Sequence, residues 1–128
     1  MGLIKTIAVV EDNKDNRLLI RALLAEHYSV VEYDSAFGSL EGFKQSVPDL
    51  IILDILLPGM DGVELLSHIR SDDRLSHLPV IALTAHAMSG DRDYYLASGF
   101  DDYVAKPIIE EELLLAAIER LLDKPKPR

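Results

Sequence analysis

The sequence has 128 residues, of which 48% are hydrophobic and 6% aromatic, and this is enough for one domain with an aliphatic core. Its formal net charge of −9 argues against direct binding to nucleic acid. The sequence contains no cysteine, which excludes disulfides and thiolate metal ligands, and no apolar run is long enough to span a membrane. We therefore expect a soluble cytoplasmic protein without a nucleic-acid or membrane partner.

Strand-like and helix-like segments alternate five times along the chain. The strand-like segments are mostly continuous runs of valine, isoleucine and leucine, which is typical of parallel strands buried on both faces. Strands are predicted at Ile4–Val10, Ser29–Tyr33, Leu50–Leu53, Val80–Leu83 and Tyr103–Ala105. Helices are predicted at Lys14–Glu26, Phe37–Gln45, Gly62–Arg70, Met88–Ser98 and Glu110–Leu122. This order predicts an α/β fold in which helices cover both faces of a doubly wound parallel sheet.

Two of these helices are weakly specified by their own sequences. The second contains Gly38 and Gly42, and each glycine costs about 1 kcal/mol relative to alanine in a helix interior. The fourth has few apolar residues to turn inward beyond Leu96, so it is either an ordinary surface helix or a moving part. We expect one domain over residues 1–123 and a flexible tail over residues 124–128.

Polar side chains stand at the carboxyl ends of four predicted strands. Glu11 and Asp12 follow the first strand, Asp54 the third, Thr84 the fourth and Lys106 the fifth. Open parallel sheets place their ligand sites outside the carboxyl ends of the strands, so these side chains are expected to meet in one crevice. Three carboxylates held together need a counter-cation, and oxygen ligands without sulfur favour Mg²⁺.

The chemical interpretation of these residues has to be weighed against an ordinary structural one. The acidic residues after the first strand are typical of helix N-termini, where Asn13 or Asp15 would suit the cap. A carboxylate that closes a fully apolar strand is seldom structural, and Asp54 can instead act as a nucleophile towards phosphorus. A lone threonine at a strand end is usually structural or an N-cap, but here the Thr84 hydroxyl also suits donation to a phosphoryl oxygen. Lys106 suits pairing with the carboxylates, and its bond to the following proline is a candidate cis peptide.

Taken together, these segments resemble the receiver domain of bacterial two-component response regulators, from Ile4 to about Leu122. The resemblance is carried by Val9–Asn13, Leu53–Gly62, Leu83–Ala85 and Tyr103–Pro107. It implies a flavodoxin-like (βα)₅ fold, a three-layer sandwich whose parallel sheet has the strand order 2-1-3-4-5. The segments look most similar to the receivers of hybrid histidine kinases and of single-domain phosphorelay regulators.

The resemblance also implies a phosphorylation-activated signalling switch. Asp54 would be the phosphoacceptor, and Thr84 and Lys106 would contact the phosphoryl group. Tyr103 matches the switch aromatic of the family and would respond to movement of Thr84. The phosphoryl donor would be a histidine kinase or a histidine phosphotransfer protein, and the domain would catalyse only its own phosphorylation and dephosphorylation. The surface of the fourth helix, fifth strand and fifth helix would carry the signal to a downstream protein that the sequence does not identify.

The same resemblance implies how Mg²⁺ would be held. Asp12 and Asp54 would be direct ligands, the carbonyl oxygen of Leu56 would complete the protein ligands, and Glu11 would act largely through water. Both the cation and the phosphoryl group would therefore lie at the carboxyl edge of the sheet.

Two other functions compete with this one. A phosphohydrolase of the haloacid dehalogenase type also uses a strand-end aspartate with Mg²⁺, but it needs a second aspartate where this chain has Leu56. A module that binds a flavin phosphate needs a phosphate-cradling loop after the first strand, where Glu11 and Asp12 would instead repel phosphate. The sequence favours the phosphorylation switch over both.

Overall fold

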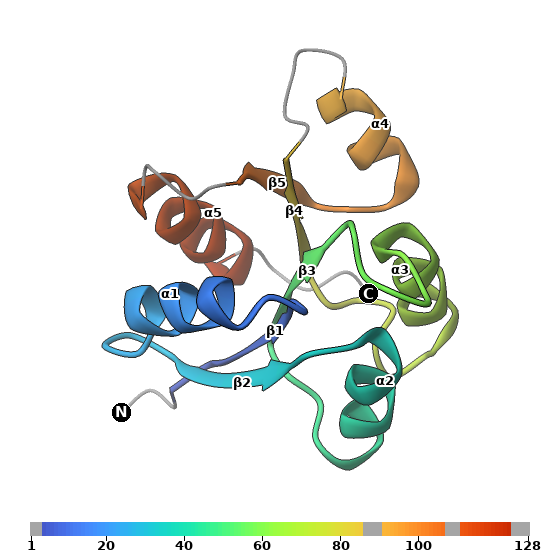
Figure 1. Ribbon diagram of the computed structural model, residues 1–128, viewed down its shortest axis with the longest axis horizontal. Helices are drawn as coiled ribbons and strands as arrows, with labels where there is room; N and C mark the ends of the chain where they lie inside the picture. The colour runs from blue at the N-terminus through green and yellow to red at the C-terminus, as the bar shows by residue number, and fades with distance from the viewer. Residues whose placement is uncertain (1–3, 86–90, 107–110, 124–128) are drawn as a thin grey trace.

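The computed structural model describes residues 4–85, 91–106 and 111–123 (Figure 1). Strands and helices alternate along the described residues in the predicted order. They are β1 (Thr6–Val10), α1 (Lys14–Leu24), β2 (Ser29–Tyr33), α2 (Ala36–Gln45), β3 (Leu50–Asp54), α3 (Gly62–Ser71), β4 (Val80–Thr84), α4 (Asp91–Ser98), β5 (Asp102–Ala105) and α5 (Glu111–Asp123). None of the described helices is long and apolar enough to cross a membrane.

The five strands form one parallel sheet in the order β2-β1-β3-β4-β5, which confirms the predicted flavodoxin-like topology. The chain runs outward from β1 to β2 and then returns to place β3 on the other side of β1. The direction of winding therefore reverses between β1 and β3, and a ligand crevice is expected at the carboxyl ends of these two strands. Asp54 pairs in register with Leu83, and Thr84 pairs with Ala105, so the polar ends of β3, β4 and β5 are aligned.

Helices cover both faces of the sheet (Figure 1). On one face, Ile7 and Val9 of β1 pack in a cluster with residues of α1 and α5. On the other, Ala8 and Val10 pack in a cluster with residues of α2, α3 and α4. Every residue of β3 and β4 is buried, as predicted for strands covered on both sides.

The predicted boundaries need small corrections. β1 begins at Thr6 rather than Ile4, because Thr6 is the first residue paired with β2 and Ile4 is 72% exposed. α1 ends at Leu24 rather than Glu26, and β3 and β4 each extend one residue to include Asp54 and Thr84. The predicted start of the fourth helix, the proposed cis bond to proline and the tail over residues 124–128 lie outside the described residues.

Gly42 weakens α2 locally but serves the packing of that helix. A Cβ atom at this position would lie 2.3 Å from the hydroxyl oxygen of Tyr33 and 2.4 Å from an edge carbon of its ring. The glycine therefore leaves the space that the Tyr33 ring occupies, and that ring stacks edge-on against Phe43 with 5.4 Å between the ring centroids. The helix is consequently held by tertiary packing despite its poor intrinsic propensity.

Candidate functional site

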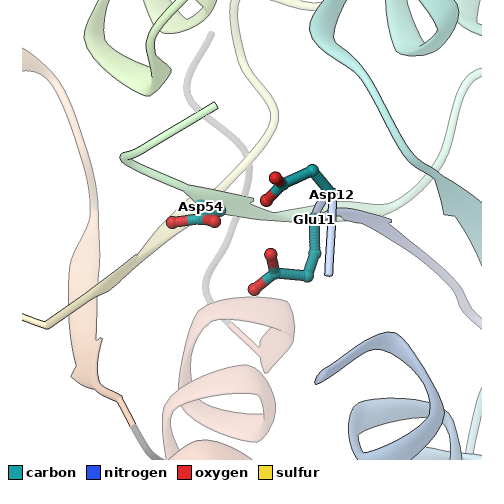
Figure 2. A group of neighbouring side chains, drawn as sticks. All are labelled: Glu11, Asp12 and Asp54. Carbon is teal, nitrogen blue, oxygen red and sulfur yellow. The ribbon is translucent and has the colours of Figure 1, made fainter. Parts of the chain in front are cut away.

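Three carboxylates converge at the carboxyl ends of β1 and β3. Glu11 and Asp12 follow β1, Asp54 is the last residue of β3, and Figure 2 shows their side chains pointing toward one another. One carboxylate oxygen from each residue lies within 4.8 Å of the others. Glu11 and Asp54 are buried, with 0% and 2% of their surface exposed, whereas Asp12 is exposed. The structure thus brings together the three acidic residues that the sequence singled out.

Lys106 supplies the cation that these buried charges need. Its Nζ atom lies 3.1 Å from Oε1 of Glu11 and 3.1 Å from Oδ2 of Asp54. Burial acts to lower the pKa of the Lys106 ammonium, but hydrogen bonds to Asp54 and Glu11, together with their negative charges, outweigh it and raise the pKa above its ordinary value. Lys106 therefore remains an ammonium at neutral pH, and it holds the two buried carboxylates together.

Backbone and amide donors hold the two buried carboxylates in place. The backbone N–H of Asn13 donates to Oε2 of Glu11 at 3.1 Å, and the side-chain amide of Asn16 donates to Oε1 at 3.2 Å. The Leu56 N–H donates to Oδ1 of Asp54 at 3.0 Å. Among the described residues, the Asp12 carboxylate has no such donor. Of the three carboxylates, that of Asp12 is therefore the most available to a ligand.

Arg17 of α1 binds the acidic loop, the segment of Glu11 and Asp12 between β1 and α1, and this contact was not predicted from the sequence. Its Nη1 atom donates to the backbone carbonyls of Glu11 and Asp12, at 2.8 and 3.0 Å, and its Nε lies 3.4 Å from a carboxylate oxygen of Glu32. Asn13 caps the same helix by accepting a hydrogen bond from the Asn16 backbone, which confirms one of its two predicted caps. The sequence carries no clear signal for this role, because the partners of Arg17 Nη1 are backbone carbonyls.

A close backbone approach shapes the loop after Asp54. The Gly62 N–H donates to the Ile55 carbonyl at 2.8 Å, and Asp61 caps α3 through the Glu64 N–H. A Cβ atom at Gly62 would lie 2.6 Å from the backbone oxygen of Asp54, closer than real contacts allow. The absence of a side chain at Gly62 is therefore what lets the start of α3 pack against the end of β3.

Thr84 lies at the end of β4, beside this cluster in the sheet. Its backbone carbonyl accepts a 2.8 Å hydrogen bond from the Lys106 N–H, so it is tied to the residue that carries the ammonium. Its side chain is 2% exposed, and its hydroxyl lies 2.8 Å from the hydroxyl of Tyr95 in α4. The Tyr95 ring in turn lies 6.1 Å from the ring of Tyr103, the other predicted switch residue. Sequence reasoning looked to Leu96 as the anchor of this helix, but Leu96 is only half-buried and Tyr95 is the buried anchor.

The chemistry of this cluster suits a hard divalent cation. Three carboxylates and one ammonium leave two negative charges in a small volume. In octahedral coordination at about 2.1 Å, ligand oxygens are separated by about 3.0 Å or about 4.2 Å, so carboxylates within 4.8 Å need only small adjustments. The oxygens of Glu11 already have protein donors, whereas Asp12 is exposed. The donor set therefore fits Mg²⁺, and Asp12 is the carboxylate most available to it.

Comparison with known proteins gives consistent relatives. A family model described as the response regulator receiver domain matches residues 7–119. The chain is 44% identical over 109 residues to the signal transduction histidine-protein kinase BarA of Escherichia coli (strain K12), covering 84% of this chain and 12% of that protein. It therefore spans only about an eighth of the length of that kinase. It is 39% identical over 105 residues to the polar-differentiation response regulator DivK of Brucella anthropi, covering 81% of this chain and 85% of that one.

A solved structure resembles the whole fold. The receiver domain of the sensor histidine kinase PA1611 from Pseudomonas aeruginosa superposes with a TM-score of 0.85 at 32% sequence identity. The match covers 95% of this chain and all of the other. That crystal structure is described as having a magnesium ion coordinated in its active site cleft.

Proposed function

The chain belongs to the response regulator receiver domain family of two-component and phosphorelay systems, and we propose that Asp54 is the residue that accepts its phosphoryl group. One observation carries the proposal. Asp54 is a buried carboxylate at the switch point of the sheet, paired with the Lys106 ammonium and within 4.8 Å of the acidic residues that follow β1. This arrangement would combine a nucleophile, a cation and a candidate metal site at one edge of the sheet.

Asp12 and Asp54 would hold Mg²⁺ together with the Leu56 carbonyl, and Glu11 would contribute through water. When bound, the ion neutralises charge on the phosphoryl oxygens and presents phosphorus to the nucleophile. The magnesium ion in the active site cleft of the PA1611 receiver and the cluster of three carboxylates here support this assignment. The hydrogen bonds to both oxygens of Glu11 support its indirect role, because they leave it less free to ligate than Asp12.

The chemistry asked of the protein is mainly positioning. A carboxylate nucleophile has no proton to lose, so no base is needed: an oxygen–phosphorus bond would form as the phosphorus–nitrogen bond of a phosphohistidine breaks, and the electron pair of that bond would leave with the imidazole. Lys106 would stabilise the negative charge on the phosphoryl group, and Thr84 would donate a hydrogen bond to one of its oxygens. In dephosphorylation, water attacks the same phosphorus, which releases inorganic phosphate and restores the carboxylate.

The donor would be a histidine kinase or a histidine phosphotransfer protein, encountered in the cytoplasm. The similarity to the receiver part of a kinase supports this class of donor. The phosphorylated domain, over residues 1–123, would signal through the surface formed by α4, β5 and α5. The contacts of Tyr95 in α4 with both Thr84 and Tyr103 support this route.

Phosphorylation by a small donor tests the assignment. With acetyl phosphate and Mg²⁺, the intact mass should rise by about 80 Da, the mass of one phosphoryl group, and revert on standing because acyl phosphates hydrolyse. Asp54→Asn should not be labelled. Asp61→Asn is the matched control, since Asp61 is exposed in the same loop and asparagine keeps its cap. Undiminished labelling of Asp54→Asn would contradict the proposal.

A further inference from the structure

A buried pair of hydroxyl groups connects the site to α4. The Thr84 and Tyr95 hydroxyl oxygens lie 2.8 Å apart, and only 2% and 5% of these two residues is exposed. Either oxygen can be the donor in this pair. A buried hydrogen bond of this kind has a defined geometry and is costly to leave unmade. The position and the proton of the Thr84 hydroxyl therefore depend on a residue outside the acidic cluster.

A count of protons fixes the direction of this hydrogen bond once a phosphoryl group is present. A threonine hydroxyl has one proton to donate, and phosphoryl oxygens at neutral pH mainly accept. If the Thr84 proton goes to the phosphoryl oxygen, the Thr84 oxygen can act only as the acceptor in its hydrogen bond with Tyr95. Tyr95 then becomes the donor in a chain that runs from its phenolic O–H through the Thr84 hydroxyl to phosphate, and successive bonds in such a chain strengthen one another.

We propose that Tyr95 is a positioning residue for phosphoryl binding, which directs the single proton of Thr84 toward the phosphoryl group. This inference rests on the function proposed above. The phenolic O–H of Tyr95 acts through Thr84 and does not itself contact the phosphoryl group.

The surroundings of the Tyr95 ring give this pair a structural consequence. The ring lies 6.1 Å from Tyr103 of β5 and 6.1 Å from Phe100, and it belongs to the core cluster on that face of the sheet. One side chain of α4 thus contacts both residues that the sequence predicted to form the switch. When Thr84 binds a phosphoryl oxygen, the Tyr95 hydroxyl is held as its donor, and the helix that carries Tyr95 is held with it.

Beryllofluoride affinity in the presence of saturating Mg²⁺ tests the proposal. Tyr95→Phe removes the hydroxyl and keeps the ring, and it should bind beryllofluoride about threefold to tenfold more weakly, the usual worth of one hydrogen bond. Tyr94→Phe is the matched control, because Tyr94 is the neighbouring tyrosine of the same helix and is 57% exposed. The affinity for Mg²⁺ alone should be the same in all three proteins, since Tyr95 belongs to α4 and is not one of the residues proposed to hold the ion.

A double-mutant cycle separates action through Thr84 from a general structural effect. In a Thr84→Ala background the Tyr95→Phe substitution should no longer change beryllofluoride affinity, whereas in Thr84→Ser, which keeps a hydroxyl, it should. An equal loss in the Thr84→Ala background, no loss, or tighter binding by Tyr95→Phe would overturn the inference. If the wild-type protein binds no beryllofluoride, that result would contradict the proposed function itself, and the proposed role of Tyr95 would be contradicted as well.

Discussion

Lys106 and Asp54 form an ion pair that reaches across an intervening strand. Asp54 ends β3, Lys106 follows β5, and β4 lies between them, yet Nζ and Oδ2 are 3.1 Å apart. The same Nζ lies 3.1 Å from the buried Glu11, which follows β1. One ammonium thus offsets the repulsion between carboxylates that follow or end two other strands.

Lys106→Met should destabilise the metal-free protein by about 1–3 kcal/mol at neutral pH, because it leaves two buried carboxylates without their cation. Urea unfolding measures this change. Lys44→Met is the matched control, since the Lys44–Glu41 pair is exposed on α2 and a pair of that kind is worth about 0–1 kcal/mol. Equal losses in the two variants would show that the buried pairs contribute no more than a surface pair.

The stability difference between wild type and Lys106→Met should also depend on pH. The pKa of Lys106 is raised in the folded protein above its ordinary value of 10.5, so the charged form favours folding. Its contribution is therefore complete below pH 10.5 and is lost as the pH rises through the folded pKa. Unfolding free energies of the two proteins should converge in that alkaline range. A gap that widens there would mean that the neutral amine is the form that the site stabilises.

Mg²⁺ should raise the melting temperature of the wild-type protein, and much less that of Asp12→Asn. A ligand that binds only the folded state stabilises it by about 2.7 kcal/mol at a hundredfold excess over Kd. Asp12 is the exposed carboxylate of the cluster and has no donor among the described residues, so it is expected to contribute directly. Asp15→Asn, at an exposed carboxylate in the first turn of α1, should respond like wild type. Identical responses of Asp12→Asn and Asp15→Asn would contradict the site.

The pattern of the sequence predicted a doubly wound parallel sheet and the side chains that meet at its edge, whereas the order of the strands was implied by the resemblance to receiver domains. Continuous apolar runs mark buried parallel strands, and the polar residue at the end of each run marks its carboxyl end. Asp54 and Thr84 follow from that reasoning. Their placement inside β3 and β4 rather than after them is a one-residue error, which is usual at the end of an element.

The contacts that depend on three-dimensional packing could not be predicted in this way. Arg17 binds two backbone carbonyls of the acidic loop, and a carbonyl leaves no mark in the sequence. Tyr95 is buried because its ring fits between α4 and β5 and its hydroxyl finds Thr84, whereas Tyr94 beside it is exposed. The spacing of apolar residues in α4, a helix of only about two turns, could not show which of these two tyrosines is in the core.

Gly62→Ala should destabilise the protein by about 1–3 kcal/mol, because the new methyl group would overlap the backbone of Asp54 and Ile55. It should also weaken Mg²⁺ binding, since relief of the overlap displaces the end of β3. Gly38→Ala is the control, because its methyl group would meet only the Ser35 hydroxyl, the end of a small side chain. Thermal melts with and without Mg²⁺ measure both effects. Unchanged Mg²⁺ binding by Gly62→Ala would show that the close approach does not position Asp54.

Beryllofluoride should alter hydrogen exchange in α4 and β5 as well as in the loop after Asp54. The Thr84 hydroxyl is bonded to Tyr95 of α4, whose ring faces Tyr103 of β5, so a change at Thr84 alters the packing of both elements. A reversal of the population from 1:99 to 99:1 requires roughly 5.5 kcal/mol of differential affinity, and the contacts of Thr84, Lys106 and the metal ion would supply part of it.

Hydrogen exchange followed by mass spectrometry can resolve peptides that cover Asp91–Ser98 and Asp102–Ala105. Thr84→Ala separates binding from transmission: it should keep the protection of the Asp54 loop, because Lys106 and the carboxylates remain, but lose the change in those two peptides. If the two peptides are unchanged in wild type while the Asp54 loop is protected, α4 and β5 do not respond to the site. If they change equally in Thr84→Ala, the signal reaches them by a route other than the Thr84–Tyr95 pair.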